Sequence, residues 1–264
     1  MKTVHCMLQV KGGVGKSLIS AVLAQYLINN NSDTHLFDTD PLNQTFSRYK
    51  ALNVEVVNIV GANNVIDHSK FDMLIEELIN RNGIALIDNG SATFLPLMQY
   101  FKENAVLEML QQYGVEVVFH IPLQGGGGLE DTLDGLAAIL ENFNVKVVVW
   151  LNHNQGDIVI SGKQFVDTKI YKDNADKIIG VCEIKNRQNN LYDSDIQRMT
   201  ENHLTLDEIK QSTDPLWRLM NKQRISIFYR DICEQLDAIP LFTAPAAKQG
   251  KEKADKVEKS TATA

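Results

Sequence analysis

The sequence predicts an α/β fold with a doubly wound, mostly parallel sheet flanked by helices. Two observations lead to this prediction. Short, continuous apolar segments of the kind buried on both faces of a parallel sheet recur along the chain. Longer helix-compatible segments alternate with them, which is the order of elements in a doubly wound fold.

The expected elements follow one another with short connections. Strands are predicted at residues 4–10, 35–38, 84–88, 115–121, 145–151 and 178–184. Helices are predicted at residues 16–29, 71–80, 96–112, 129–142 and, near the end of the chain, about 216–236. Residues 54–60 are a further strand candidate without a defined place in the sheet.

The length of 264 residues favours one α/β domain with a large core, although length alone also allows two smaller domains. We assign residues 1–243 to a P-loop ATPase domain and residues 244–264 to a disordered charged tail. The tail is rich in Lys, Glu, Ala and Thr and has no aromatic residue. A membrane-binding amphipathic helix would need bulky apolar residues on one face, and the tail offers only Val257.

Composition points to a soluble, cytoplasmic protein. The three cysteines are odd in number and lack C-x-x-C spacing, so they indicate reduced thiols rather than a disulfide framework or a zinc site. No apolar stretch approaches the roughly 18 residues of a membrane-spanning helix, and the N-terminus lacks a signal-peptide profile. The six histidines show no ligand spacing.

The net charge of −7 gives a surface that as a whole does not attract nucleic acid or anionic lipid. A local exception lies between residues 216 and 230, which carry four basic residues and no acidic one. On a helix, Arg218 and Lys222 would share a face, whereas Arg224 would point away from them. This face is either a patch for non-specific DNA or a partner, or a solvated helix surface.

A glycine-rich segment directly follows the first apolar run and reads Lys11, Gly12, Gly13, Val14, Gly15, Lys16 and Ser17. Its glycines allow backbone conformations closed to residues with a Cβ, so consecutive N–H groups can surround phosphate oxygens. Residues 18–26 are helix-compatible, which would turn the positive end of a helix toward the phosphates. Lys16 can supply charge to the β- and γ-phosphates of ATP, and the Ser17 hydroxyl can ligate Mg²⁺.

The segment departs from the ordinary pattern G-x-x-x-x-G-K-[ST], because Val10 stands where that pattern has glycine. Its form is K-G-G-x-G-K-S, with Lys11 as an additional lysine. In this form the loop resembles that of the deviant Walker-A P-loop ATPases, which include the ParA and MinD proteins. The resemblance implies a nucleotide-driven switch. A glycine-rich turn can also be only a tight connection, but two lysines and a serine at these positions serve no packing purpose.

Carboxylates stand where two predicted strands end, at the sheet edge where doubly wound folds bind ligands. Asp38 and Asp40 lie two residues apart and so roughly on one side of an extended segment, where they could hold Mg²⁺ through water and orient an attacking water. Asp88 closes an apolar run in the Walker-B form and would serve Mg²⁺. Gly90 then suits a segment that senses the γ-phosphate. The alternatives are an acidic turn at Asp38 and an ordinary strand-to-turn boundary after Asp88.

Two further strand ends are less specific. Asn152 could pair with the edge of the adenine base, because an amide both donates and accepts, or it could simply form a turn. The run of glycines at 125–128 has no lysine nearby, which favours a flexible strand-to-helix connection over a second phosphate loop.

The chain also resembles the TraL proteins of conjugative plasmids at residues 8–17, 38–46, 49–54, 87–91, 148–152 and 234–238. The resemblance implies a ParA-like ATPase accessory to plasmid transfer or maintenance, which forms an ATP-dependent homodimer and acts with a protein partner. In such ATPases the additional lysine, here Lys11, reaches across the dimer interface to the neighbour's ATP, and the second aspartate, here Asp40, positions the hydrolytic water. One departure is Lys185, since many ParA relatives carry proline after this strand.

The expected function is therefore a switch that binds Mg²⁺ and ATP, dimerises, and hydrolyses ATP slowly unless a partner stimulates it. Two other classes stay open. A DNA-coating partition ATPase would bind DNA in an ATP-dependent and salt-sensitive manner. A small-molecule enzyme such as dethiobiotin synthetase shares the sheet and loop type, and would transfer phosphate to a substrate at a substantial rate.

Overall fold

The computed structural model describes residues 2–30, 33–61, 67–187 and 190–243. A seven-stranded sheet has the order β3, β2, β4, β1, β5, β6 and β9, and every neighbouring pair is parallel. Its strands are β1 (Lys2–Met7), β2 (Thr34–Asp38), β3 (Glu55–Val56), β4 (Ile84–Asp88), β5 (Val115–Gln124), β6 (Lys146–Asn152) and β9 (Ile178–Ile184). The predicted doubly wound, mostly parallel sheet is confirmed.

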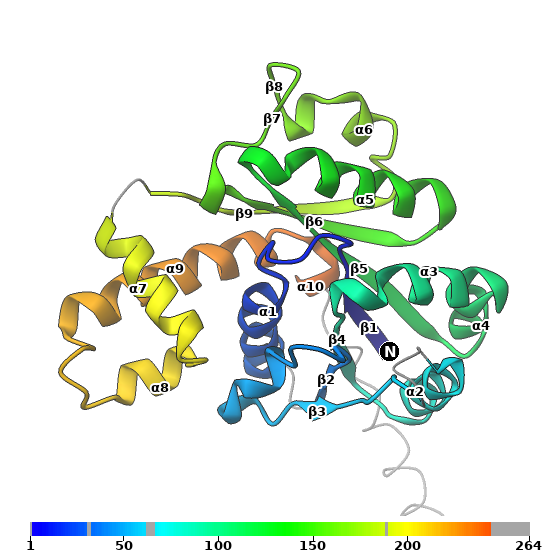
Figure 1. Cartoon of the computed structure of the whole chain (residues 1–264), viewed down its shortest axis with the longest axis horizontal. Helices are drawn as coiled ribbons and strands as arrows, with labels where there is room; N and C mark the ends of the chain where they lie inside the picture. Colours follow the sequence, from blue (N-terminus) through cyan, green and yellow to red (C-terminus); the bar gives the residue numbers. More distant parts are fainter. Residues whose placement is uncertain (1, 31–32, 62–66, 188–189, 244–264) are drawn as a thin grey trace, which may run out of the picture.

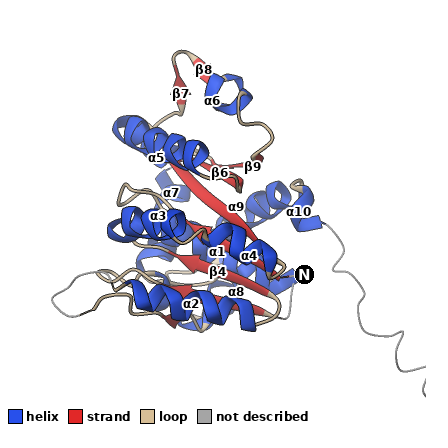
Figure 2. Cartoon of the chain, turned by 90° about the vertical axis from the view of Figure 1, so that its right-hand side faces the viewer, coloured by secondary structure: helices blue, strands red, loops and turns tan. Residues whose placement is uncertain are grey.

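Helices cover both faces of this sheet. One face carries α2 (His68–Asn80), α3 (Phe94–Glu103), α4 (Val106–Gln112) and α5 (Leu129–Asn142). The other face carries α1 (Lys16–Asn30), α7 (Asn190–Glu201), α8 (Leu206–Gln211), α9 (Leu219–Asp237) and α10 (Pro240–Thr243). Figure 1 shows α1, α7, α8 and α9 on one side and α2, α3 and α4 on the other. Figure 2 shows α5, α3 and α2 stacked along the face opposite to α1.

The continuous apolar character of the strands follows from this three-layer arrangement. Successive side chains of a strand point to opposite faces, so a strand covered on both sides is apolar at every position. In β1, Val4 and Cys6 pack into the core beneath α2 and α3, whereas Met7 packs into the core beneath α1. All three are buried.

Several predicted boundaries differ from the structure. The helix predicted at 96–112 is two helices, because Ala105 takes a left-handed conformation with φ 46° between α3 and α4. The strand predicted at 54–60 is only the two-residue edge strand β3, which pairs with the end of β2. The first strand ends at Met7 rather than at residue 10, and β5 continues past residue 121 to Gln124.

Residues 153–177 form a small outgrowth that the sequence did not predict. It contains the hairpin of β7 (Val159–Ile160) and β8 (Lys163–Gln164), followed by α6 (Lys169–Lys172), at the top of Figure 1. The hairpin turns at Ser161 and Gly162, whose positive φ angles of 51° and 75° suit a two-residue turn.

The C-terminal helix predicted at about 216–236 is α9. The predicted disordered tail at 244–264 lies outside the described residues. Within the described ranges, no helix is both long enough and apolar enough to cross a membrane.

Candidate phosphate-binding site

The glycine-rich loop connects β1 to α1 at the carboxyl edge of the sheet, where doubly wound folds bind their ligands. Gly13 and Gly15 have φ angles of 73° and 93°, which residues with a Cβ rarely adopt. A Cβ on Gly15 would also lie 2.8 Å from Nδ2 of Asn152. The two glycines therefore allow left-handed backbone conformations in the loop, and Gly15 also allows its close packing against Asn152.

Lys16 points inward beneath this loop and is buried. Its Nζ donates to the carbonyl oxygens of Gln9 (3.3 Å) and Lys11 (3.0 Å) and to Oγ of Ser91 (2.8 Å). Burial lowers the pKa of Lys16, while the charges of Asp88 and Asp40 act in the opposite direction. A phosphate group would give this poorly solvated ammonium the anionic partner that three neutral oxygens do not.

Asp88 lies at the end of β4 and is buried against the start of α1. Its two oxygens accept hydrogen bonds from Oγ of Ser17 (2.7 Å) and of Ser20 (2.8 Å). Burial raises the pKa of Asp88 to about 7, although both serine hydroxyls and Lys16 oppose the shift. A carboxylate with an adjacent hydroxyl is a donor set that suits Mg²⁺, which takes few protein ligands and keeps phosphate oxygens and waters.

Asp38 ends β2, and its carboxylate is completely buried. It accepts the backbone N–H groups of Asp40 (3.0 Å) and Ser47 (2.9 Å). Burial raises the pKa of Asp38, against the effect of these two hydrogen bonds. The carboxylate therefore holds the backbone of the loop that follows β2. Its charge also helps to raise the pKa of Asp88.

Asp40 lies farther out on the same loop. Its Oδ1 accepts the N–H groups of Leu42 (2.9 Å) and Asn43 (3.1 Å). Gly90 makes room for it, since a Cβ there would lie 2.6 Å from Cγ of Asp40. The structure thus brings Asp40 against the segment that follows Asp88, although the two are far apart in sequence.

Several residues that connect these parts were missed by sequence reasoning. Ser20 reaches Asp88 from one turn beyond Ser17, a spacing that places both hydroxyls on one helix face. Thr39 joins the ends of β2 and β4 through Oγ1, which donates to Oδ1 of Asn89 (2.9 Å). Only the spacing of Ser17 and Ser20 could have been found in the sequence, because the other contacts depend on which strands are neighbours.

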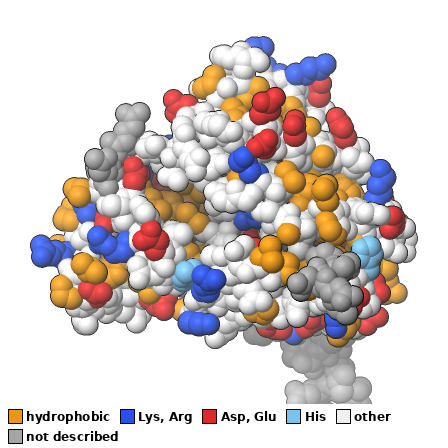
Figure 3. All heavy atoms as spheres, viewed as in Figure 1, with side chains coloured by type: hydrophobic (Ala, Val, Ile, Leu, Met, Phe, Trp, Pro, Cys, Tyr) orange, Lys and Arg blue, Asp and Glu red, His pale blue; other side chains and the backbone are white. Residues whose placement is uncertain are grey.

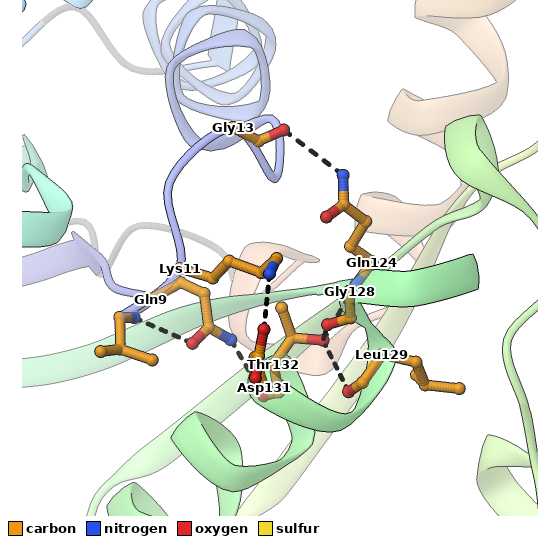
Figure 4. Close-up of polar contacts among 9 residues, drawn as sticks. Gln9, Lys11, Gly13, Gln124, Gly128, Leu129, Asp131 and Thr132 are labelled. Atoms are coloured by element: carbon orange, nitrogen blue, oxygen red, sulfur yellow. Dashed lines mark hydrogen bonds and ion pairs between the residues drawn. The ribbon is translucent and has the colours of Figure 1, made fainter.

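Lys11 points away from Lys16 and toward α5 of its own chain. Its Nζ forms an ion pair with Oδ2 of Asp131 at 2.5 Å, and both side chains are partly exposed, at 32% and 61%. Figure 4 shows the Lys11 side chain directed at the first turn of α5. Acidic side chains gather over this helix in Figure 3, and Glu130, Asp131 and Asp134 are exposed there.

Asn152, which was predicted to contact the base, contacts the phosphate loop. Its Nδ2 donates to the carbonyl oxygen of Val14 (3.0 Å), and its Oδ1 accepts the N–H of Asn154 (3.1 Å). The amide of Asn152 therefore stabilises the turn after β6 and also contacts the phosphate loop. The glycines at 125–128 connect β5 to α5, and Gly125 is packed so closely that a Cβ would lie 1.8 Å from the carbonyl oxygen of Gly156.

The basic residues near α9 have different surroundings. Arg218 precedes the helix and is exposed. Lys222 donates to the carbonyl oxygens of Lys210 (2.9 Å) and Ser212 (2.7 Å), at the end of α8. Arg224 pairs with the buried Asp195 at 2.6 Å. The ammonium of Lys222 therefore stabilises the end of α8. These two hydrogen bonds leave it less able to contact a DNA phosphate.

Comparison with known proteins extends these observations to most of the chain. A family model described as the CobQ/CobB/MinD/ParA nucleotide binding domain matches residues 6–216. The chain is 38% identical to Protein TraL from Escherichia coli over 240 residues, which cover 90% of this chain and 98% of that protein. A second Escherichia coli Protein TraL is 37% identical over 239 residues, with the same coverage.

Among solved structures, the septum site-determining protein MinD complexed with Mg-ADP from Pyrococcus horikoshii is similar in fold. The match has a TM-score of 0.50 and 16% sequence identity, and it covers 93% of this chain and 100% of that one. At this identity the match concerns the arrangement of strands and helices alone.

Proposed function

The chain belongs to the CobQ/CobB/MinD/ParA nucleotide-binding family and, within it, to the TraL proteins, and from this premise we propose that it is an ATP-driven dimerising switch. The observation that carries the proposal is the divergence of two lysines in one loop. Lys16 points into the site and Lys11 points out of it. One lysine suits the chain's own nucleotide, and the other suits a contact with a second subunit.

ATP is the proposed ligand of the loop. The backbone N–H groups of residues 12–17 would surround its phosphates, and Lys16 would exchange the Ser91 hydroxyl and two carbonyls for phosphate oxygens. The positive end of α1 adds to the attraction, because α1 begins at Lys16. Asn152 supports the loop from behind through Val14, and contact with the base remains a further proposal for this amide.

Ser17 and Asp88 would hold Mg²⁺, with Asp38 nearby as a second carboxylate. The bound ion would neutralise charge on the β- and γ-phosphate oxygens. Ser20 keeps Asp88 oriented by donating to the oxygen that Ser17 leaves free. Support comes from the similar MinD of Pyrococcus horikoshii, which was solved as a complex with Mg-ADP.

Hydrolysis requires a water molecule in line with the terminal phosphate, and we assign its orientation to Asp40. The carboxylate is held by the N–H groups of Leu42 and Asn43 and lies against Gly90. Loss of the terminal phosphate would therefore change the contacts of two loops together, the one that follows β2 and the one that follows β4. Such linked loops are a common basis for a nucleotide switch.

Lys11 would serve the nucleotide of a second subunit, as the resemblance to ParA-like ATPases implies. In the structure its ammonium pairs with Asp131 of the same chain. Exposed ion pairs contribute only about 0–1 kcal/mol, so this contact is easily exchanged for a phosphate oxygen. Dimerisation would thus require Lys11 to leave Asp131.

The proposal places the switch in plasmid transfer or maintenance, together with a protein partner. The test is a strain in which Lys16→Ala replaces the wild type, compared in a mating assay and a plasmid-retention assay. We expect at least one of the two to fail while the protein accumulates normally. Normal mating and normal retention would contradict the proposal.

A second assay separates this function from a small-molecule enzyme. The purified wild type should hydrolyse ATP slowly in the presence of Mg²⁺ and produce no phosphorylated metabolite. Rapid transfer of phosphate to an added substrate would instead indicate an enzyme of the dethiobiotin synthetase type. Salt-sensitive binding of DNA that requires ATP would indicate a partition ATPase.

A further inference from the structure

The chain leaves β1 through Gln9, a buried residue that is 1% exposed. Its Nε2 donates to the carbonyl oxygens of Pro122 in β5 (2.9 Å) and Thr132 in α5 (3.0 Å). Its Oε1 accepts the N–H of the next residue, Val10, at 2.9 Å. Gln9 therefore fixes the peptide that leads to Lys11 and attaches it to β5 and α5. Figure 4 shows the contact with α5.

A glycine inside α5 is explained by this side chain. Gly135 is buried in the middle of the helix, where glycine is normally unfavourable. A Cβ at this position would lie 2.2 Å from Oε1 of Gln9, which is closer than atoms can approach. The helix thus has a gap at the place where the amide of Gln9 enters.

A second glutamine is arranged in the same manner at the start of α5. Gln124 has its Oε1 2.3 Å from where a Cβ of Gly128 would be. Its Nε2 is 3.4 Å from the carbonyl oxygen of Gly13, and its N–H donates to Oγ1 of Thr132. Figure 4 shows this amide directed from β5 toward the phosphate loop. The loop is therefore attached to the first turns of α5 from both sides.

The same turn of α5 also holds Lys11. Thr132, which accepts from Gln9, is the neighbour of Asp131, which pairs with Lys11. Gln9 precedes Lys11 by two residues, so a rotation of its peptide would change the direction of the lysine. The direction of Lys11 consequently depends on three bonds made by one buried amide.

We propose that Gln9 is a positioning residue for Lys11, which it holds at the outer surface of the loop where a second subunit can be reached. This inference rests on the proposed function, because it concerns the lysine that would contact the neighbour's nucleotide. Gln9 does not bind the nucleotide through its side chain, which faces α5 and β5 rather than the loop interior. Loss of Gln9 should therefore affect dimerisation more than nucleotide binding.

The test uses Gln9→Met, which keeps the length of the side chain and removes its hydrogen bonds. Titration with a fluorescent ATP analogue should give a Kd within about twofold of the wild type, which corresponds to only a few tenths of a kcal/mol. Light scattering with ATP and Mg²⁺ should show that dimerisation requires about tenfold more protein, or about 1.4 kcal/mol. Equal losses of nucleotide binding and dimerisation would show that Gln9 supports the whole site rather than Lys11 alone, and would overturn the proposal.

A second variant reaches the same amide from the other side. Gly135→Ala favours the helix but displaces Gln9, so it should weaken dimerisation in the same selective way. The double variant Gln9→Ala with Gly135→Ala should be no worse than Gln9→Ala, because the Cβ of Ala would then occupy the space that Gln9 leaves. Additive losses would contradict the link between the two residues.

The wild-type control separates this inference from the proposed function. A wild type that does not dimerise with ATP would overturn the proposed function and, with it, the role of Gln9. A wild type that dimerises beside a Gln9→Met variant that dimerises equally well would overturn only the role of Gln9.

Discussion

The two sides of the phosphate loop differ in how far the structure has already assembled them. On the inner side, Lys16, Ser17 and Asp88 are joined by direct hydrogen bonds to the residues around them, and Lys16 and Asp88 are buried. On the outer side, Lys11 and Asp131 form a partly exposed ion pair. The difference leads us to propose that binding of nucleotide and contact with a second subunit are separable properties of one loop.

Electrostatics differ between the two sides in the same direction. Burial lowers the pKa of Lys16 and raises that of Asp88 to about 7. The inner side therefore contains two ionisable groups that are poorly solvated. The outer pair faces water, and salt screens it. The inner side should therefore respond strongly to mutation, and the outer side should respond to ionic strength.

The largest expected effect is that of Lys16→Ala on nucleotide binding. The variant loses charge-assisted hydrogen bonds worth about 3 kcal/mol, so the Kd for a fluorescent ATP analogue should rise by about 100-fold. Lys16→Arg is a control that keeps the charge and changes its shape. An unchanged Kd for Lys16→Ala would break the comparison, because the inner side would not then be the binding side.

The strands beneath the loop should make the protein sensitive to acid. His5 and His120 are buried in contact, with Nδ1 of His5 2.9 Å from Nε2 of His120, and Trp150 donates to Nδ1 of His120. Burial lowers the pKa of His5 to about 3 and that of His120 well below its usual range. Unfolding releases both rings to titrate normally, so they stabilise the fold fully above about pH 6.5 and progressively less below it.

Each of these imidazoles contributes a slope of about 1.4 kcal/mol per pH unit between roughly pH 6.5 and pH 4. Asp88 acts oppositely over this range, because its raised pKa stabilises the fold at low pH and loses that effect as pH rises through about 7. Asp38, whose pKa burial also raises, acts in the same direction as Asp88, so two carboxyls oppose the two imidazoles. Mutation isolates the imidazole contribution: urea unfolding at pH 7, 6 and 5 should show that His5→Gln loses less stability on acidification than the wild type. The same pH dependence in His5→Gln and the wild type would contradict the assignment.

The smallest expected effect comes from the outer pair. Asp131→Asn frees Lys11 from an exposed contact worth about 0.2–1 kcal/mol, so ATP-dependent dimerisation should need up to about fivefold less protein. The difference should shrink as salt is added. Glu130→Gln is the matched control, because Glu130 is the exposed acidic neighbour in α5. A weaker dimer in Asp131→Asn would show that Asp131 supports the interface instead of competing with it.

The sequence predicted the sheet and the inner side of the loop because both are local patterns. Continuous apolar runs marked the strands, and Lys16, Ser17 and Asp88 each occupy a position fixed by a short motif. The break at Ala105 was not predicted, because a left-handed alanine between two helices leaves no mark in apolar spacing. The hairpin of β7 and β8 was missed because each strand is only two residues long.

The outer side could not be predicted from sequence, because its contacts join distant segments. Lys11 and Asp131 are 120 residues apart, and Gln9 and Thr132 are 123 apart. Gly135 shows why such contacts escape sequence reasoning. Within the sequence of α5, Gly135 appears only as an unfavourable helix residue. The structure explains the glycine, because the side chain of Gln9, which follows β1, occupies the space that a Cβ would need.

The most direct test of the account is the oligomeric state of Lys11→Ala with ATP and Mg²⁺ bound. Light scattering should show the wild type shifting from monomer to dimer, whereas Lys11→Ala remains a monomer although fluorescence titration shows nucleotide bound with near wild-type affinity. A Lys11→Ala protein that dimerises at the same concentration as the wild type would contradict the account, because the outward lysine would then have no role between subunits.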